Sequence, residues 1–139
     1  SSPTDSSYAY VLLPGASAVA TGVWAHSRPV RIVANDATVQ AVEARRLGLL
    51  AAHFWGPGSV GGLTSSGPGT VLVRRHGDTV AVAVADPGRT GSTLTVELPF
   101  PVRKVTRADD TITLTPGRRP VLTVDVAGSR GHSHTAELA

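Results

Sequence analysis

The strongest constraint on the fold is the segment of residues 70–86, in which two β-rich arms flank a short turn at residues 76–78. Valine alternates with smaller or polar residues along both arms, so each arm would bury one face and leave the other wetter. Two such arms joined by a short link that contains glycine predict an antiparallel hairpin. Its packed face would consist of Val71, Val73, Val80, Val82 and Val84.

Strand patterns also fill the C-terminal part of the chain. Residues 92–100 alternate leucine and valine with threonine and glutamate, which is typical of a half-buried strand. Residues 86–88 would form a turn, and Asp109 and Asp110 the tip of a hairpin. Strands at this spacing predict an all-β fold, an antiparallel β-sandwich. Further strands are expected at residues 102–107, 111–115, 121–126 and 133–138.

Residues 35–55 allow two interpretations. As a helix, the segment could begin at the Asn-Asp pair, with apolar residues at helical spacing on one face. Gly48 in its middle and Arg46 on the core-facing side count against that helix. As two strands, residues 38–45 and 47–54 would pivot about the arginine pair and Gly48. The local pattern alone leaves this choice open.

The N-terminal part begins with a polar stretch, residues 1–7, for which we expect no regular structure. Residues 8–13, YAYVLL, predict an apolar strand that has no partner nearby in the sequence. A short helix is expected at residues 17–26, capped by Ser17. A short strand should follow at residues 30–34. The glycine-rich residues 56–69 should form a loop with at most one short strand, at residues 60–64.

Composition limits the classes of protein. The 139 residues suit one domain, and 41% of them are hydrophobic, which argues against general disorder. The chain has no cysteine, which excludes disulfides and thiolate metal sites, and no apolar run long enough to span a membrane. It starts at serine and contains no methionine, so we expect a processed chain or a piece of a longer polypeptide.

The net charge of +3 comes almost wholly from arginines. They are spread one or two at a time, unlike the clustered Lys and Arg with interleaved aromatics of a nucleic-acid binder. We therefore expect neither a nucleic acid nor a membrane as partner. Solvated strand faces are the favoured explanation of the arginines. The alternative is a weakly positive surface that faces an anionic polymer.

Few residues indicate chemistry directly. His132 and His134 could form half of a zinc site, but no third ligand has suitable spacing, although His53 or Asp125 could lie nearby in space. No GxSxG motif supports a serine hydrolase, and no GxxxxGK[ST] motif supports phosphate binding. The adjacent aromatics at residues 54–55 are either a sugar-stacking platform or, as we favour, part of the core.

Three segments carry a resemblance to a known family. They are YAYVLLPGAS at residues 8–17, TVQAVEARRLGLLAAHFW at residues 38–55 and VLVRRHGDTVAVAVADP at residues 71–87. Their order and spacing resemble the C-terminal part of polysaccharide lyase family 8, which includes hyaluronate, chondroitin and xanthan lyases. The resemblance favours strands over a helix in the second segment.

The resemblance implies a domain organisation. A helical toroid with the catalytic residues and a central β super-sandwich would precede this chain. Residues 1–15 would then be the last strand of that central domain, residues 16–29 a linker with a short helix, and residues 30–139 the C-terminal β-sandwich. No catalytic residue of the family can be placed on this chain, and no metal or cofactor is implied.

The resemblance also implies a function. The parent enzyme would be an extracellular lyase that degrades an acidic polysaccharide, hyaluronan favoured, by β-elimination. This chain would support the central domain and could border the cleft. Its partners would be the remaining domains of that enzyme and the anionic polysaccharide. An independent carbohydrate-binding module and a purely structural or interaction domain remain alternatives. The residues expected to contact glycan are Arg45, Arg46, Trp55, Arg74 and Arg75.

Overall fold

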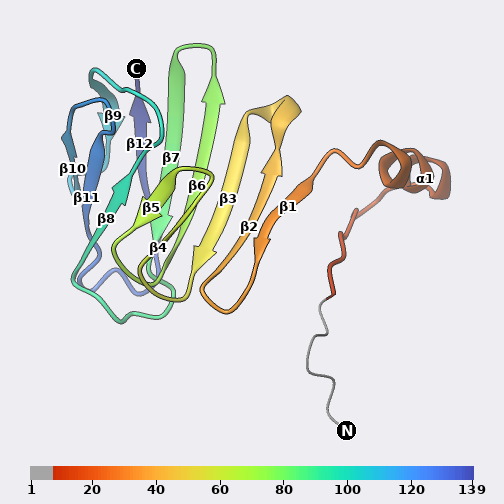
Figure 1. Ribbon diagram of the computed structural model, residues 1–139, viewed down its shortest axis with the longest axis horizontal. Coiled ribbons are helices and arrows are strands. Elements are labelled where there is room, and N and C mark those ends of the chain that lie inside the picture. The colour runs from red at the N-terminus through yellow and green to blue at the C-terminus, as the bar shows by residue number, and fades with distance from the viewer. Residues whose placement is uncertain (1–7) are drawn as a thin grey trace, which may run out of the picture.

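The predicted valine hairpin forms the centre of the larger of two β-sheets in the computed structural model, which describes residues 8–139 (Figure 1). Its strands are β6 (Gly69–His76) and β7 (Thr79–Ala85), which pair antiparallel. Val71 lies opposite Val84 and Val73 opposite Val82, and all four are buried. The hairpin prediction is confirmed. The expectation for residues 1–7 lies outside the described residues.

Two antiparallel sheets make up the fold, which confirms the all-β prediction. The larger sheet has the order β1-β2-β3-β6-β7-β12-β9, and the smaller one β10-β11-β8-β5-β4. The larger sheet adds β1 (Arg31–Asn35), β2 (Val39–Ala44), β3 (Leu49–Phe54), β9 (Val105–Ala108) and β12 (His134–Leu138). The smaller sheet contains β4 (Gly58–Val60), β5 (Leu63–Ser65), β8 (Thr93–Glu97), β10 (Ile112–Thr115) and β11 (Val121–Asp125).

The hydrophobic core lies between the two sheets. Alternate residues of the strands point inward, as the period of two requires. The two sheets contribute to one continuous cluster, which runs in sequence from Val39 to Leu138. The hydrophobic core of the sandwich is therefore formed by residues of its own two sheets. The largest fully buried apolar side chains are Phe54, Leu63, Leu98, Leu122 and Leu138.

The open question about residues 35–55 is settled in favour of strands. Strands β2 and β3 pair antiparallel and are joined by a 3-10 turn, Arg45–Leu47, which ends at Gly48 with φ of 60°. Val39 and Phe54 are opposite each other and both face the core. A helix would have kept Gly48 in its interior, whereas the turn uses the left-handed conformation that glycine adopts without strain.

The N-terminal segments lie outside the sandwich. Helix α1 (Ala18–Ser27) starts where predicted, with the Ser17 hydroxyl accepting from the Ala20 N–H at 3.2 Å. None of its residues is buried, so its apolar side chains contact no core, and Figure 1 shows it beyond the β1 edge. Residues 8–13 form no strand in the described chain. Their assignment to a preceding domain stays a prediction.

Two loop predictions are wrong. Asp109 and Asp110 do not form a hairpin tip, because β9 and β10 belong to different sheets and this segment crosses between them. The Asp109 carboxylate accepts the Thr135 N–H at 2.6 Å, and this bond holds the pKa of Asp109 below its ordinary value. Residues 56–69 contain a hairpin, β4 and β5, rather than one strand, because Gly61 and Gly62 adopt positive φ at its turn.

Candidate functional site

Four of the predicted glycan-contact residues meet at one end of the sandwich. The turn after β2 carries Arg45 and Arg46, and the end of β6 carries Arg74 and Arg75. Because β3 pairs with β6, Leu49 lies opposite Arg74, and the Arg75 N–H donates to the Gly48 carbonyl at 2.8 Å. These two pairs, far apart in the sequence, therefore lie on neighbouring segments.

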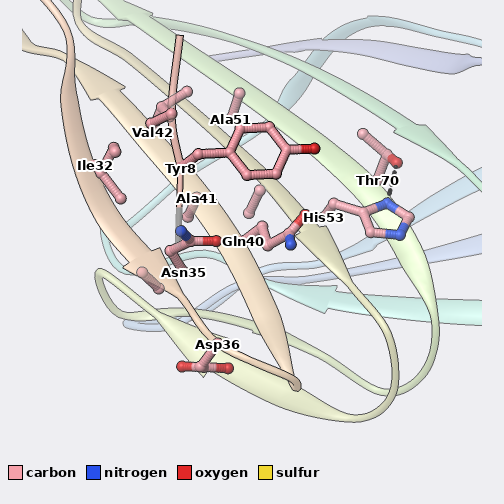
Figure 2. Close-up of a pocket in the computed structure, with 13 residues that line it drawn as sticks. Tyr8, Ile32, Asn35, Asp36, Gln40, Ala41, Val42, Ala51, His53 and Thr70 are labelled. Atoms are coloured by element: carbon pink, nitrogen blue, oxygen red, sulfur yellow. Dashed lines mark hydrogen bonds between the residues drawn. The ribbon is translucent and has the colours of Figure 1, made fainter. Parts of the chain in front are cut away.

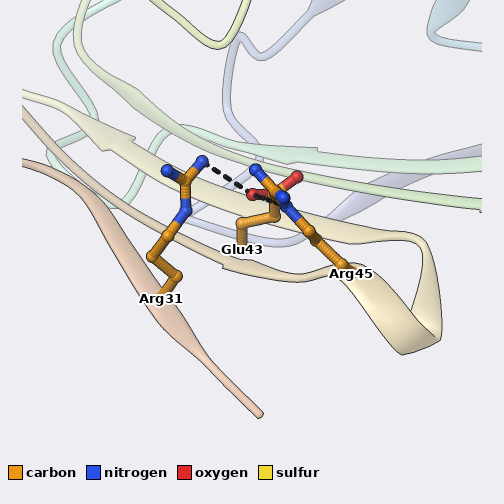
Figure 3. A network of polar contacts seen from close by, with 3 residues as sticks. All are labelled: Arg31, Glu43 and Arg45. Carbon is orange, nitrogen blue, oxygen red and sulfur yellow. Dashed lines mark hydrogen bonds and ion pairs between the residues drawn. The ribbon is translucent and has the colours of Figure 1, made fainter. Parts of the chain in front are cut away.

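The guanidinium groups of Arg45 and Arg75 have different partners. Arg45 Nε donates to Glu43 Oε2 at 3.1 Å, and Arg31 Nη2 reaches the same oxygen at 2.9 Å (Figure 3). The bonds from Arg45 and then Arg31 hold the pKa of Glu43 below its ordinary value. Such exposed pairs contribute little to stability. Arg75 lies over the Phe100 ring, 5.4 Å from its centre, as a cation–π pair.

Trp55 lies far from this arginine cluster. It follows the last residue of β3, whereas Gly48 precedes the first, and at about 3.3 Å per residue the separation is roughly 20 Å. Trp55 is 58% exposed, and its ring forms a T-shaped pair with the His53 ring, with 4.3 Å between ring centres. The expectation that both adjacent aromatics belong to the core holds for Phe54 and is wrong for Trp55. The five predicted residues do not form one site.

A second feature, missed by sequence reasoning, is an open cavity of about 670 Å³ on the outer face of the larger sheet (Figure 2). The Tyr8 ring lies over it, above Val42 and Ala51. Three of the polar side chains that line it have hydrogen-bond partners. His53 Nδ1 and the Thr70 hydroxyl are 2.9 Å apart, and Asp36 accepts the backbone N–H groups of its own turn at 2.8 and 2.9 Å.

An apolar row crosses this same outer face. Strand register places one residue from each of five neighbouring strands side by side, and each of the three largest is more than a third exposed. Such a row has no part in the core of the sandwich. It can be found from sequence only once the strand order is known. We call it the outer-face row, and it consists of Ile32, Val42, Ala51, Leu72 and Ala83.

The two C-terminal histidines do not share a strand face. His134 opens β12 and is buried, with its Nδ1 2.7 Å from the Thr111 hydroxyl. His132 is exposed after the preceding turn, and its backbone N–H donates to the Ser129 carbonyl at 2.9 Å. Among residues 8–139, no three His, Asp or Glu side chains are grouped so as to hold a metal ion. No helix in this part of the chain is long and apolar enough to cross a membrane.

Comparison with known proteins gives concordant matches. Residues 31–95 match the family model for the polysaccharide lyase family 8, C-terminal beta-sandwich domain. A hyaluronate lyase from Thermasporomyces composti is 37% identical, over 99% of this chain and 18% of that protein. A xanthan lyase from Bacillus sp. (strain GL1) is 32% identical, over 98% of this chain and 15% of that protein.

Comparison with solved structures also matches this chain to part of a lyase. A chondroitin AC lyase from Streptomyces coelicolor A3 superposes with a TM-score of 0.82 at 40% identity, over 91% of this chain and 17% of that one. The same lyase in complex with chondroitin sulphate gives 0.80 at 39% identity. The chain thus spans less than a fifth of the length of each of these relatives. With sequence, topology and relatives in agreement, this chain belongs to polysaccharide lyase family 8, as its C-terminal β-sandwich domain.

Proposed function

We propose that this chain is the non-catalytic C-terminal portion of a secreted lyase that degrades an acidic polysaccharide, with hyaluronan as the favoured substrate. The observation that carries the proposal is the match of nearly the whole chain to less than a fifth of a hyaluronate lyase and of a chondroitin AC lyase. The reaction is β-elimination, in which a base removes the C5 proton of a uronic acid and the 4-linked oxygen leaves protonated.

Support for the non-catalytic role comes from two titratable side chains of the outer-face cavity, His53 and Asp36. β-Elimination needs a free acid/base group and a group that neutralises the substrate carboxylate. In this cavity His53 is bonded to Thr70, and the Asp36 carboxylate is bonded to its own turn. Hydrogen bonds from that turn, first that of Val39, hold the pKa of Asp36 below its ordinary value, which makes it a weaker base.

The test is turnover by the isolated chain. Mixed with hyaluronan, the pure 139-residue chain should produce no rise in ultraviolet absorbance from unsaturated uronic acid. A complete hyaluronate lyase serves as the positive control under the same conditions. Clear turnover by the pure chain that survives repurification would overturn the non-catalytic role, and His53→Ala would then show whether the outer-face cavity is responsible.

We also propose that the outer-face row packs against the preceding part of the same lyase. Two observations support this occupant. The relatives are more than five times as long as this chain. In addition, the ring of Tyr8, in the N-terminal segment, already lies over the same face. An exposed apolar row across five strands is a common mark of a protein–protein contact. The domain would thereby buttress the enzyme.

This contact can be tested with two separate polypeptides. The chain and the preceding part of its own lyase should co-elute in size-exclusion chromatography. Leu72→Glu places a charge within the outer-face row and should weaken association at least about tenfold, since burying an unpaired charge is expensive. Thr113→Glu, at an exposed position on the smaller sheet, is the matched control. Unchanged association of the Leu72→Glu variant would place the contact elsewhere.

A further inference from the structure

The fold separates the charges of this chain between the two ends of the sandwich. The turns after β2, β6 and β10 and the segment from β8 to β9 lie at the same end, because these strands run antiparallel in pairs (Figure 1). Nine of the thirteen Lys and Arg residues fall there, against Glu43, Asp78 and Glu97. We call it the basic end. Its cations are Arg31, Arg45, Arg46, Arg74, Arg75, Arg103, Lys104, Arg118 and Arg119.

The opposite end carries the reverse balance. Its turns and strand ends hold five acidic residues, against Arg89 and Arg130 in the turns and Arg107 near the end of β9. An arrangement of this kind concentrates positive potential at one end of a molecule whose net charge is only +3. The acidic residues are Asp36, Asp86, Asp109, Asp110 and Asp125.

The basic end contains a groove of about 590 Å³ between the β6–β7 hairpin and the segment that leads into β9. Three cations, Arg75, Arg103 and Lys104, line it together with Phe100 and one acidic residue, Asp78. The backbone of the second wall is fixed by hydrogen bonds, because the backbone N–H groups of Arg103 and Lys104 donate to a main-chain oxygen of Ala139 at 2.8 and 3.0 Å. The cationic side chains therefore project from a fixed backbone.

A smaller hollow of about 240 Å³ extends the groove. It shares Arg75 and Phe100 with the groove and reaches Arg45 and Gly48 in the turn after β2. Together the two hollows form a path from the Arg45 turn, past the Arg75–Phe100 pair, to Lys104. A path of this shape suits a linear polymer better than a compact ligand.

The chemistry of this path identifies the class of ligand. Guanidinium groups bind carboxylates and sulfates in paired hydrogen bonds, and the guanidinium of Arg75 is positioned in the path by its contact with the Phe100 ring. Nucleic-acid binding would call for several exposed aromatics on which bases stack, and the path holds one, Phe100. We propose that the basic end binds a segment of an acidic polysaccharide, with Arg75, Arg103 and Lys104 contacting its carboxylates. The choice of polymer rests on the proposed function, whereas the location of the site does not.

The test is a binding titration of the 139-residue chain, whose sandwich has its own closed core. Hyaluronan oligosaccharides should bind at low salt and bind more weakly as salt is raised, because the contacts are ionic and exposed. The double variant Arg103→Gln/Lys104→Gln should raise Kd at least about tenfold. The matched control is Arg89→Gln/Arg130→Gln, which removes the same charge at the opposite end and should change Kd less than about twofold.

Each other outcome decides against the proposal. Equal losses in both double variants would show that net charge, not the groove, attracts the polymer. No binding of hyaluronan or chondroitin sulphate at millimolar sugar would remove the site altogether. Tighter binding of single-stranded DNA than of either glycan would assign the basic end to another polyanion, with neutral dextran as the blank. Thermal unfolding of each variant checks the fold. Binding without turnover leaves the proposed function intact, so the two failures are distinguishable.

Discussion

Replacing Phe54 with alanine is expected to lower the free energy of unfolding by about 3–5 kcal/mol, the range for a large aromatic side chain removed from a packed core. Phe54 has no exposed surface and joins β3 to the core cluster. Removing its ring leaves a cavity that two hydrogen-bonded sheets cannot easily close. Urea denaturation of the isolated chain, followed by circular dichroism, measures the difference.

The neighbouring residue supplies the control for this prediction. Trp55 is larger but 58% exposed, so Trp55→Ala should lower the free energy of unfolding by less than about 1 kcal/mol. Similar losses for the two variants would mean that Trp55 is covered in solution. A small loss for Phe54→Ala would mean that the core packs differently from the arrangement described above.

Gly48→Ala should also lower the free energy of unfolding strongly. A Cβ at this position would overlap the Arg75 carbonyl oxygen, at the point where the turn after β2 meets β6. The residue also has φ of 60°, which costs an alanine about 1–2 kcal/mol. The overlap adds to that strain by pushing apart the β3–β6 pairing, so we expect a total loss of at least about 3 kcal/mol.

Gly77 separates the two contributions. Its φ of 58° is nearly the same, but nothing lies within 4 Å of an added Cβ. Gly77→Ala should therefore show the backbone strain alone, about 1–2 kcal/mol. Thermal and urea unfolding of the two variants side by side give the comparison. If the free energy of unfolding falls equally in both variants, the turn at Gly48 relaxes without disturbing β6. The overlap with the Arg75 carbonyl then contributes nothing to the loss.

The fold was largely predictable where the signal is local. The hairpin, the Ser17-capped helix and most strands follow from alternation, capping and turn residues that are neighbours in sequence. The placement of Trp55 was also within reach, because adjacent residues of a strand point to opposite faces, so Phe54 and Trp55 could not both enter the core. The helical alternative for residues 35–55 lost to pairing with β6, which is a long-range contact.

The candidate site was less accessible to prediction. The sequence indicates the arginines only as individual candidates, because their proximity depends on β3 pairing with β6. They are Arg45, Arg46, Arg74 and Arg75. No sequence pattern indicates Arg103 and Lys104, because they reach the groove through the pairing of β9 with β12, strands far apart in sequence. The outer-face row likewise needs the register of five strands. Spacing along one chain carries no information about such cross-strand neighbours.

The position of β12 has a consequence for how this domain is made in the cell. The last strand in sequence is not at an edge of the larger sheet but inserts between β7 and β9, with Leu138 fully buried. While the ribosome is still synthesising the chain, β7 therefore has one open side, and β9 has no partner in its sheet. Folding cannot finish before the residues up to Leu138 have emerged, and until then the exposed strand edges are available for wrong pairing.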